Sequence, residues 1–286
     1  MTVRLLPGVP GSTVATQVQS ALEALHNAQS GAHTPLERYD AYQRWATAHA
    51  LTLAHSVTPA SLDELVTSRR FEAMQAIDPN VHGALAWFVD LEVHQRSTAL
   101  TAALSDLQRM LRSWAGVIDI VVPDTNLFLH HEHDLQHLDW HALAGRPSGP
   151  VDVVVTTVVI EELDRRKRDP SGRKGSAAVE STRNRARRTL RMIDDAFVNP
   201  FATPDLVPAT ADRSPVRWRL LLDSPDHRPL PVADAELVDR ATEVRDLTEG
   251  RVTVASFDTL VGLRARAQRL RSHNPAEAVS SPPASG

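Results

Sequence analysis

The 286-residue sequence predicts an α/β fold with a mostly parallel sheet, preceded by an all-α region. Up to about residue 115, apolar residues recur at spacings of three and four, which is typical of amphipathic helices. Beyond that point short apolar runs alternate with helical segments, which favours right-handed crossovers and a sheet covered on both faces. We therefore expect a helical region over 1–115 and an α/β domain over 116–272. A loop-rich insertion is expected at about 199–231, and a disordered tail over 273–286.

Four helices are predicted in the first region. The first runs from about Val14, and the second and third begin at Pro35 and Pro59, each of which follows a threonine that suits the N-cap position. A long fourth helix extends over His82–Trp114. No residue pattern in this region indicates chemistry.

Four apolar runs predict the strands of the second region, over 117–122, 151–155, 216–222 and 252–255. Helices are expected over 161–168, 177–198, 234–247 and 257–270. Gly250 is expected to end the third of these helices, because glycine adopts the left-handed conformation that commonly follows a helix. The alternation of strands and helices supports a parallel sheet.

Composition excludes several classes of protein. The chain has no cysteine, so disulfide scaffolds and cysteine-based zinc sites are ruled out. Hydrophobic residues make up 42% and charged residues 23%, as in ordinary globular proteins. No apolar run approaches the ~20 residues that a membrane span needs, and the first residues lack a signal-peptide pattern. We therefore expect a cytoplasmic protein without membrane contact.

The net charge of -4 conceals a basic segment. Between Arg165 and Arg191 there are eleven Lys or Arg residues against two acids. This density predicts contact with a polyanion, although a solvated helical face is the alternative interpretation. The expected nucleic-acid contacts are Arg165, Arg166, Lys167, Arg168, Arg173, Lys174, Arg183 and Arg187.

Acidic residues follow the predicted strands. Asp124 follows the first strand, Glu161 and Glu162 begin the helix after the second, Asp234 opens a later helix, and Asp258 follows the last strand. Ligands of open parallel sheets bind just beyond the carboxyl ends of the strands. Carboxylates that converge there repel one another unless a cation lies between them, and Mg²⁺ and Mn²⁺ prefer oxygen ligands. The pattern therefore predicts a divalent-metal site suited to phosphodiester hydrolysis, while a turn or helix-cap role is the alternative for each aspartate.

Four segments, in order, resemble the motifs of the PIN-domain nucleases: VVPDTNLFL, VVIEELDRRK, DAELVDRA and RVTVASFDTLVGLRARA. The resemblance covers about 116–270 and implies a PIN-like α/β/α sandwich. It also implies Mg²⁺- or Mn²⁺-dependent cleavage of single-stranded RNA, and by family analogy a homodimer. The implied catalytic and metal-binding acids are Asp124, Glu162, Asp234 and Asp258. The implied supporting residues are Asn126 and Ser256.

Two features depart from that family's pattern. The third motif has a single Asp where many relatives have a pair, so Glu236 and Asp239 are alternative third ligands. The gap between Glu162 and Asp234 is long because of the proline-rich insertion, which indicates a flap or a partner surface.

Other interpretations stay open at this point. The domain would be a non-catalytic module if it only binds RNA or a protein, or a toxin-type ribonuclease if an antitoxin controls it. Three histidines, His133, His137 and His141, would share one face of a helix and suit Zn²⁺, or that segment is a polar helix beside the active site.

Overall fold

The computed structural model describes residues 3–76, 82–130, 135–146, 148–168, 181–224 and 227–275. The chain divides into two compact units. The helical unit comprises Met1–Ala115 with Asp246–Thr248, and the α/β unit comprises Gly116–Arg245 with Glu249–Gly286.

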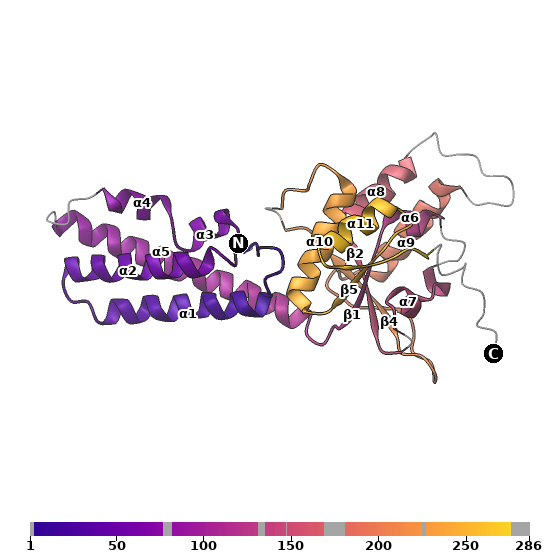
Figure 1. The fold of residues 1–286 in the computed structure, drawn as a ribbon, viewed down its shortest axis with the longest axis horizontal. Helices are drawn as coiled ribbons and strands as arrows, with labels where there is room; N and C mark the ends of the chain where they lie inside the picture. The colour runs from indigo at the N-terminus through magenta and orange to yellow at the C-terminus, as the bar shows by residue number, and fades with distance from the viewer. Residues whose placement is uncertain are drawn as a thin grey trace. The chain divides into compact units, whose positions relative to one another are not determined.

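Five helices build the helical unit: α1 (Gly11–Ser30), α2 (Pro35–Leu53), α3 (Pro59–Leu65), α4 (Arg69–Gln75) and α5 (His82–Ser113). Helices α1, α2 and α5 lie side by side and bury a shared apolar core (Figure 1). A capping box starts α2, in which Thr34 accepts a hydrogen bond from the Glu37 amide and Glu37 accepts one from the Thr34 amide. The short helix α4 was not predicted, because its seven residues bury only Met74.

A buried acid lies inside the helical unit. Glu92 is fully buried, accepts hydrogen bonds from Tyr42 and Ser68, and pairs with Arg96 at 3.2 Å. Burial raises the pKa of Tyr42, and the nearby Glu92 charge raises it further. This network fixes α2 and α5 to the start of α4.

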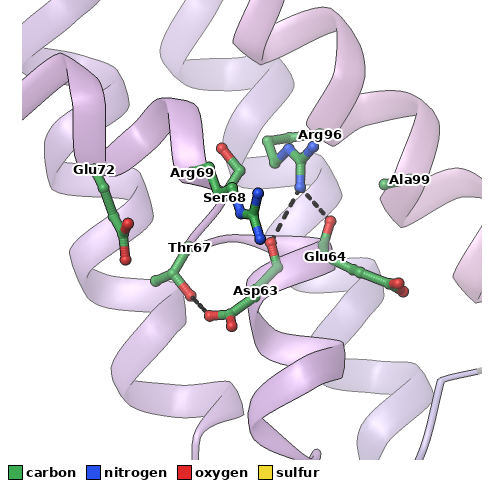
Figure 2. A pocket seen from close by; sticks show the side chains of 8 residues that line it. All are labelled: Asp63, Glu64, Thr67, Ser68, Arg69, Glu72, Arg96 and Ala99. Carbon is green, nitrogen blue, oxygen red and sulfur yellow. Dashed lines mark hydrogen bonds between the residues drawn. The ribbon is translucent and has the colours of Figure 1, made fainter.

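A cavity of about 570 Å³ opens beside this network. Figure 2 shows Arg96 directed at the backbone carbonyls of Asp63 and Glu64, and the Thr67 hydroxyl directed at the Asp63 carboxylate. The contacts that Arg96 makes in the lining of this cavity hold α5 to α3. The lining residues are Asp63, Glu64, Thr67, Ser68, Arg69, Glu72, Arg96 and Ala99.

The α/β unit contains six strands: β1 (Asp119–Pro123), β2 (Val151–Thr156), β3 (Asp205–Val207), β4 (Val216–Leu221), β5 (Arg251–Ala255) and β6 (Arg271–His273). Its helices are α6 (Thr125–His130), α7 (Trp140–Leu143), α8 (Thr157–Arg168), α9 (Thr182–Ala196), α10 (Ala233–Thr248) and α11 (Thr259–Ala267).

The six strands form one sheet in the order β3-β4-β2-β1-β5-β6. Every pairing is parallel except that of β3 with β4. Helices α6, α8 and α9 pack together, and Figure 1 shows α10 on the opposite side of the sheet from α6 and α9. These features confirm the predicted fold class, a mostly parallel α/β fold with an all-α N-terminal region.

The chain crosses the sheet in two directions. From β1 it moves through β2 to β4, and after β4 it returns to β5 on the other side of β1. The strand order therefore reverses between β1 and β5, which is where ligands bind in open α/β sheets. Both strands are almost entirely buried, in keeping with their mainly apolar sequences.

Several predicted boundaries were wrong. Helix α10 ends at Thr248, and the residue that takes the left-handed conformation after it is Glu249 (φ 54°), not Gly250. Helix α11 ends at Ala267, because the chain then forms β6 beside β5. Strands β3 and β6 were missed, since each has three residues at an edge of the sheet.

The histidine segment is not one helix among the described residues. His137 lies in a 3-10 turn (Leu135–His137) and His141 in α7, where its Nε2 is 3.0 Å from the Gly149 carbonyl oxygen. His133 lies outside the described residues, as do Arg173 and Lys174. The predicted helical face of three histidines is therefore wrong for the described part of this segment.

Candidate functional site

The site lies where β1 and β5 end. The Asp124 amide, directly after β1, donates to the carbonyl of Ala255, the last residue of β5, at 2.9 Å. Ser256 follows β5 directly, and its amide donates to the carbonyl of His273 on β6 at 3.1 Å. The backbone thereby fixes Asp124 and Ser256 side by side at the switch point of the sheet.

Asp124 is a buried carboxylate, with 4% of its surface exposed. Its Oδ2 accepts hydrogen bonds from the Ser256 hydroxyl at 2.7 Å and from the Asn126 side-chain amide at 3.3 Å. Burial raises the pKa of Asp124, and the charges of Glu162 and Asp234 raise it further, while the Ser256 hydrogen bond acts in the opposite direction. Two of the predicted acids are therefore close enough to act on Asp124 electrostatically.

Glu162 comes from α8, the helix that directly follows β2. Its Oε2 accepts a hydrogen bond of 2.6 Å from the hydroxyl of Thr125, which is itself buried. The neighbouring Glu161 is exposed, as expected for two adjacent helical residues that point about 100° apart. Thr125 was not predicted as a functional residue. The structure identifies it through its buried hydroxyl, and in the sequence it directly follows Asp124.

Asp234 is the second residue of α10 and is half-buried. Its Oδ2 lies 3.3 Å from the guanidinium of Arg264 on α11, a partner that the sequence did not reveal. The two alternative third ligands lie elsewhere on the helix. Glu236 is buried and bonded to His227, whereas Asp239 is exposed.

Asp258 is the N-cap of α11. Its Oδ1 accepts a hydrogen bond from the Leu260 amide at 2.7 Å, and its own amide donates to the Ser256 hydroxyl at 2.9 Å. The side chain is exposed. Asp258 thus fills the cap role considered from the sequence, and it also braces the hydroxyl that holds Asp124.

Basic side chains gather on α8 and α9, the helices that pack against α6. The guanidinium of Arg183 on α9 donates to the Lys167 carbonyl at the end of α8, at 3.1 Å. His130, at the end of α6, connects this basic region to the acids: burial lowers the pKa of His130, the charges of Arg185 and Arg166 lower it further, and the Asp124 charge raises it. The exposed members of the predicted set are Arg165, Arg166, Arg168 and Arg187.

A tighter group of metal-ligating side chains lies after β4. Asp223, His227 and Glu236 each offer one ligand atom, and these atoms all lie within 4.8 Å of one another. Among the described residues, Asp124, Glu162 and Asp234 do not form a group as tight as this one. The α/β unit therefore contains two acidic centres of different composition, one made of oxygen donors and one that includes an imidazole.

These features define an α/β protein with buried and half-buried acids at the reversal point of a parallel sheet. A family model described as a PIN domain matches residues 121–275, which is more than half of the chain, so the chain belongs to the PIN domain family. The family that the four motifs predicted is thereby confirmed. It is a nuclease-type family of hydrolases, which points to nucleic acid as the ligand. A search of curated proteins found no match.

Among the helices that the structure describes, none is both long enough and apolar enough to cross a bilayer.

Proposed function

We propose that the α/β unit is a divalent-metal-dependent nuclease that hydrolyses phosphodiester bonds, with RNA as its substrate. The observation that carries this proposal is the electrostatic coupling of Asp124 to Glu162 and Asp234, which come from three separate elements of a PIN domain. Like charges gathered at the reversal point of a parallel sheet raise the free energy of the metal-free fold, and a cation relieves that repulsion.

The donor chemistry fits Mg²⁺ or Mn²⁺. Asp124, Glu162 and Asp234 offer only carboxylate oxygens, and Asp258 is the fourth predicted ligand. Hard divalent cations prefer such oxygen ligands and retain several waters. A bound cation would supply the charge that lowers the pKa of a water and stabilises the phosphate oxygens during hydrolysis.

The protein's own side chains orient the acids. Ser256 and Asn126 hold Oδ2 of Asp124, and Thr125 holds Oε2 of Glu162. Because these hydrogen bonds already fix the carboxylates, little side-chain conformational entropy is lost when a cation binds. Arg264 pairs with Asp234 from α11.

The substrate backbone is proposed to lie over α8 and α9. Arg166 and Arg187 are exposed there. The charge of Arg166 lowers the pKa of His130, and the charge of Asp124 raises it, so His130 lies between the basic helices and the acids. Phosphate contacts by arginine are worth most at low salt, because binding releases the counterions of the nucleic acid. Replacing Arg166 and Arg187 by alanine should weaken RNA retention and reduce its salt dependence, whereas Arg44→Ala in the helical unit should not.

The decisive experiment is cleavage of labelled single-stranded RNA by the full chain with Mn²⁺, Mg²⁺ or a chelator. Cleavage should require the metal, and it should be lost in Asp124→Asn and Glu162→Gln. Glu161→Gln is the matched control, because it makes the same change at an exposed neighbour that points about 100° away from Glu162. Metal-dependent cleavage that persists in Asp124→Asn would refute the assignment. Salt-sensitive retention of RNA without cleavage would instead favour a binding module. Light scattering of the same preparation tests the homodimer that family analogy implies.

A further inference from the structure

The group formed by Asp223, His227 and Glu236 lies apart from the acids of the proposed nuclease site. Glu236 comes two positions after Asp234 on α10, and residues two apart on a helix point about 200° away from each other. Asp223 and His227 belong to the loop between β4 and α10. The group therefore joins that loop to the first turns of α10.

The three side chains converge in a largely dry place. His227 Nε2 lies 2.6 Å from Oε1 of Glu236 and 4.0 Å from Oδ1 of Asp223. The side chains of His227 and Glu236 are 3% and 2% exposed, and that of Asp223 is 20% exposed. One nitrogen and two oxygens thus face a common point.

Surrounding groups hold the Glu236 carboxylate and the backbone of Asp223 in place. The Leu230 amide donates to Oε2 of Glu236 at 2.7 Å, which leaves Oε1 directed at His227. The Asp223 amide donates to the Thr157 hydroxyl at 3.0 Å, which anchors the loop to the start of α8. Hydrogen bonds of this kind, made by the ligand residues to a second layer, are typical of metal sites in proteins.

Asp223 carries a buried atom without a hydrogen bond. Its Oδ1 receives none from any residue that the structure describes, although the Arg240 guanidinium lies 3.2 Å away. Arg240 is shared with Glu243 on the same helix, so its single positive charge neutralises at most one carboxylate. Holding two carboxylates largely away from water is unfavourable, and a cation that binds between them offsets that cost.

We propose that Asp223, His227 and Glu236 bind a transition-metal ion of the zinc class. An imidazole nitrogen combined with two carboxylates suits Zn²⁺, whereas Mg²⁺ prefers oxygen ligands and water. Three protein ligands leave a fourth position for water. The ion replaces the His227–Glu236 hydrogen bond by two metal bonds and ties the loop after β4 to α10. This site is independent of the proposed nuclease activity.

The test is to remove bound metal from the full chain and to measure its binding of Zn²⁺ by calorimetric titration in excess Mg²⁺. Wild type should bind one equivalent of Zn²⁺ per chain that Mg²⁺ does not displace, and Zn²⁺ should raise its melting temperature. His227→Gln and Asp223→Asn should each weaken binding at least tenfold. His26→Gln, which alters a histidine on α1 of the helical unit, should leave binding unchanged.

Two further results separate the alternatives. Asp124→Asn should bind Zn²⁺ like wild type, because its acid belongs to the other centre, and so loss of nuclease activity leaves this test intact. Absence of Zn²⁺ binding by folded wild type overturns the proposal without any variant. Full retention of binding in a folded His227→Gln protein overturns it as well, and His227 is then only the hydrogen-bond partner of Glu236.

Discussion

Thr125 offers the sharpest test of how the proposed nuclease site is organised. Its hydroxyl donates a 2.6 Å hydrogen bond to Oε2 of Glu162, and it is buried at the start of α6. Thr125→Val removes this hydrogen bond and keeps the branched shape of the side chain. Glu162 is half-buried, so water can replace the lost donor, and the free energy of unfolding should change by about 1 kcal/mol or less.

The effect on the site should be larger than the effect on the fold. Hydrogen bonds to charged groups are worth about 1.5–3 kcal/mol, and 1.4 kcal/mol corresponds to a tenfold change in an equilibrium constant. We therefore expect Thr125→Val to weaken Mn²⁺ binding or lower the cleavage rate by about 10- to 100-fold, the range seen when partners of metal ligands are removed. Calorimetric titration with Mn²⁺ and steady-state cleavage of single-stranded RNA measure the two quantities.

Two variants serve as controls for this prediction. Thr125→Ser keeps the hydroxyl and should retain most of the activity. Thr101→Val makes the same change on α5, where the hydroxyl bonds only the Ser97 carbonyl within its own helix, and it should have no effect on Mn²⁺. Equal Mn²⁺ affinity in wild type and a folded Thr125→Val protein would show that Glu162 needs no orientation, and the reasoning fails.

Three other substitutions test the remaining contacts. Native Asp124 keeps its proton to higher pH than the unfolded chain does, because burial raises its pKa, so stability falls as the pH rises through that interval. Without metal, Asp124→Asn should thus melt higher than wild type at neutral pH and lose this advantage in acid; parallel melting curves across pH would contradict this. Asp258→Asn keeps a good N-cap for α11 and should lower cleavage at most about tenfold, so a loss as complete as that of Asp124→Asn would make Asp258 a main ligand. Asp152→Ala leaves Arg219 without its buried carboxylate and should lower the free energy of unfolding by about 3 kcal/mol, which denaturant titration would disprove if the midpoint stays unchanged.

The interior of the sheet was predictable because strands covered on both faces are apolar along their whole length. Val151–Thr156 and Asp119–Pro123 are buried at every position, and their sequences are mainly apolar, with Asp152 and Asp119 as buried acids that pair with arginines. The edge strands lack this signature. Asp205–Val207 pairs on one side only and has exposed residues, and nothing local distinguishes it from the loops around it.

The neighbourhood of the acids was predictable, but their partners were not. Parallel strands bring their carboxyl ends to one edge, which is why Asp124 and Glu162 were expected near each other. That argument says nothing about the direction of a side chain. Arg264 meets Asp234 only because α11 packs with that face toward α10, and His227 meets Glu236 only because the loop after β4 folds back on the helix.

The acids of the proposed nuclease site differ in how they affect the stability of the metal-free fold. Asp234 lies in the first turn of α10, where the positive end of the helix dipole favours a carboxylate, and it pairs with Arg264. Asp124 has no such cation among its hydrogen-bond partners: it is held by a hydroxyl and an amide, and burial disfavours its charge. A divalent cation bound at Asp124 would therefore offset the cost of burying its charge. A site arranged in this way couples metal binding to the end of β1, a strand buried at every position, and so links occupancy of the site to the stability of the α/β unit.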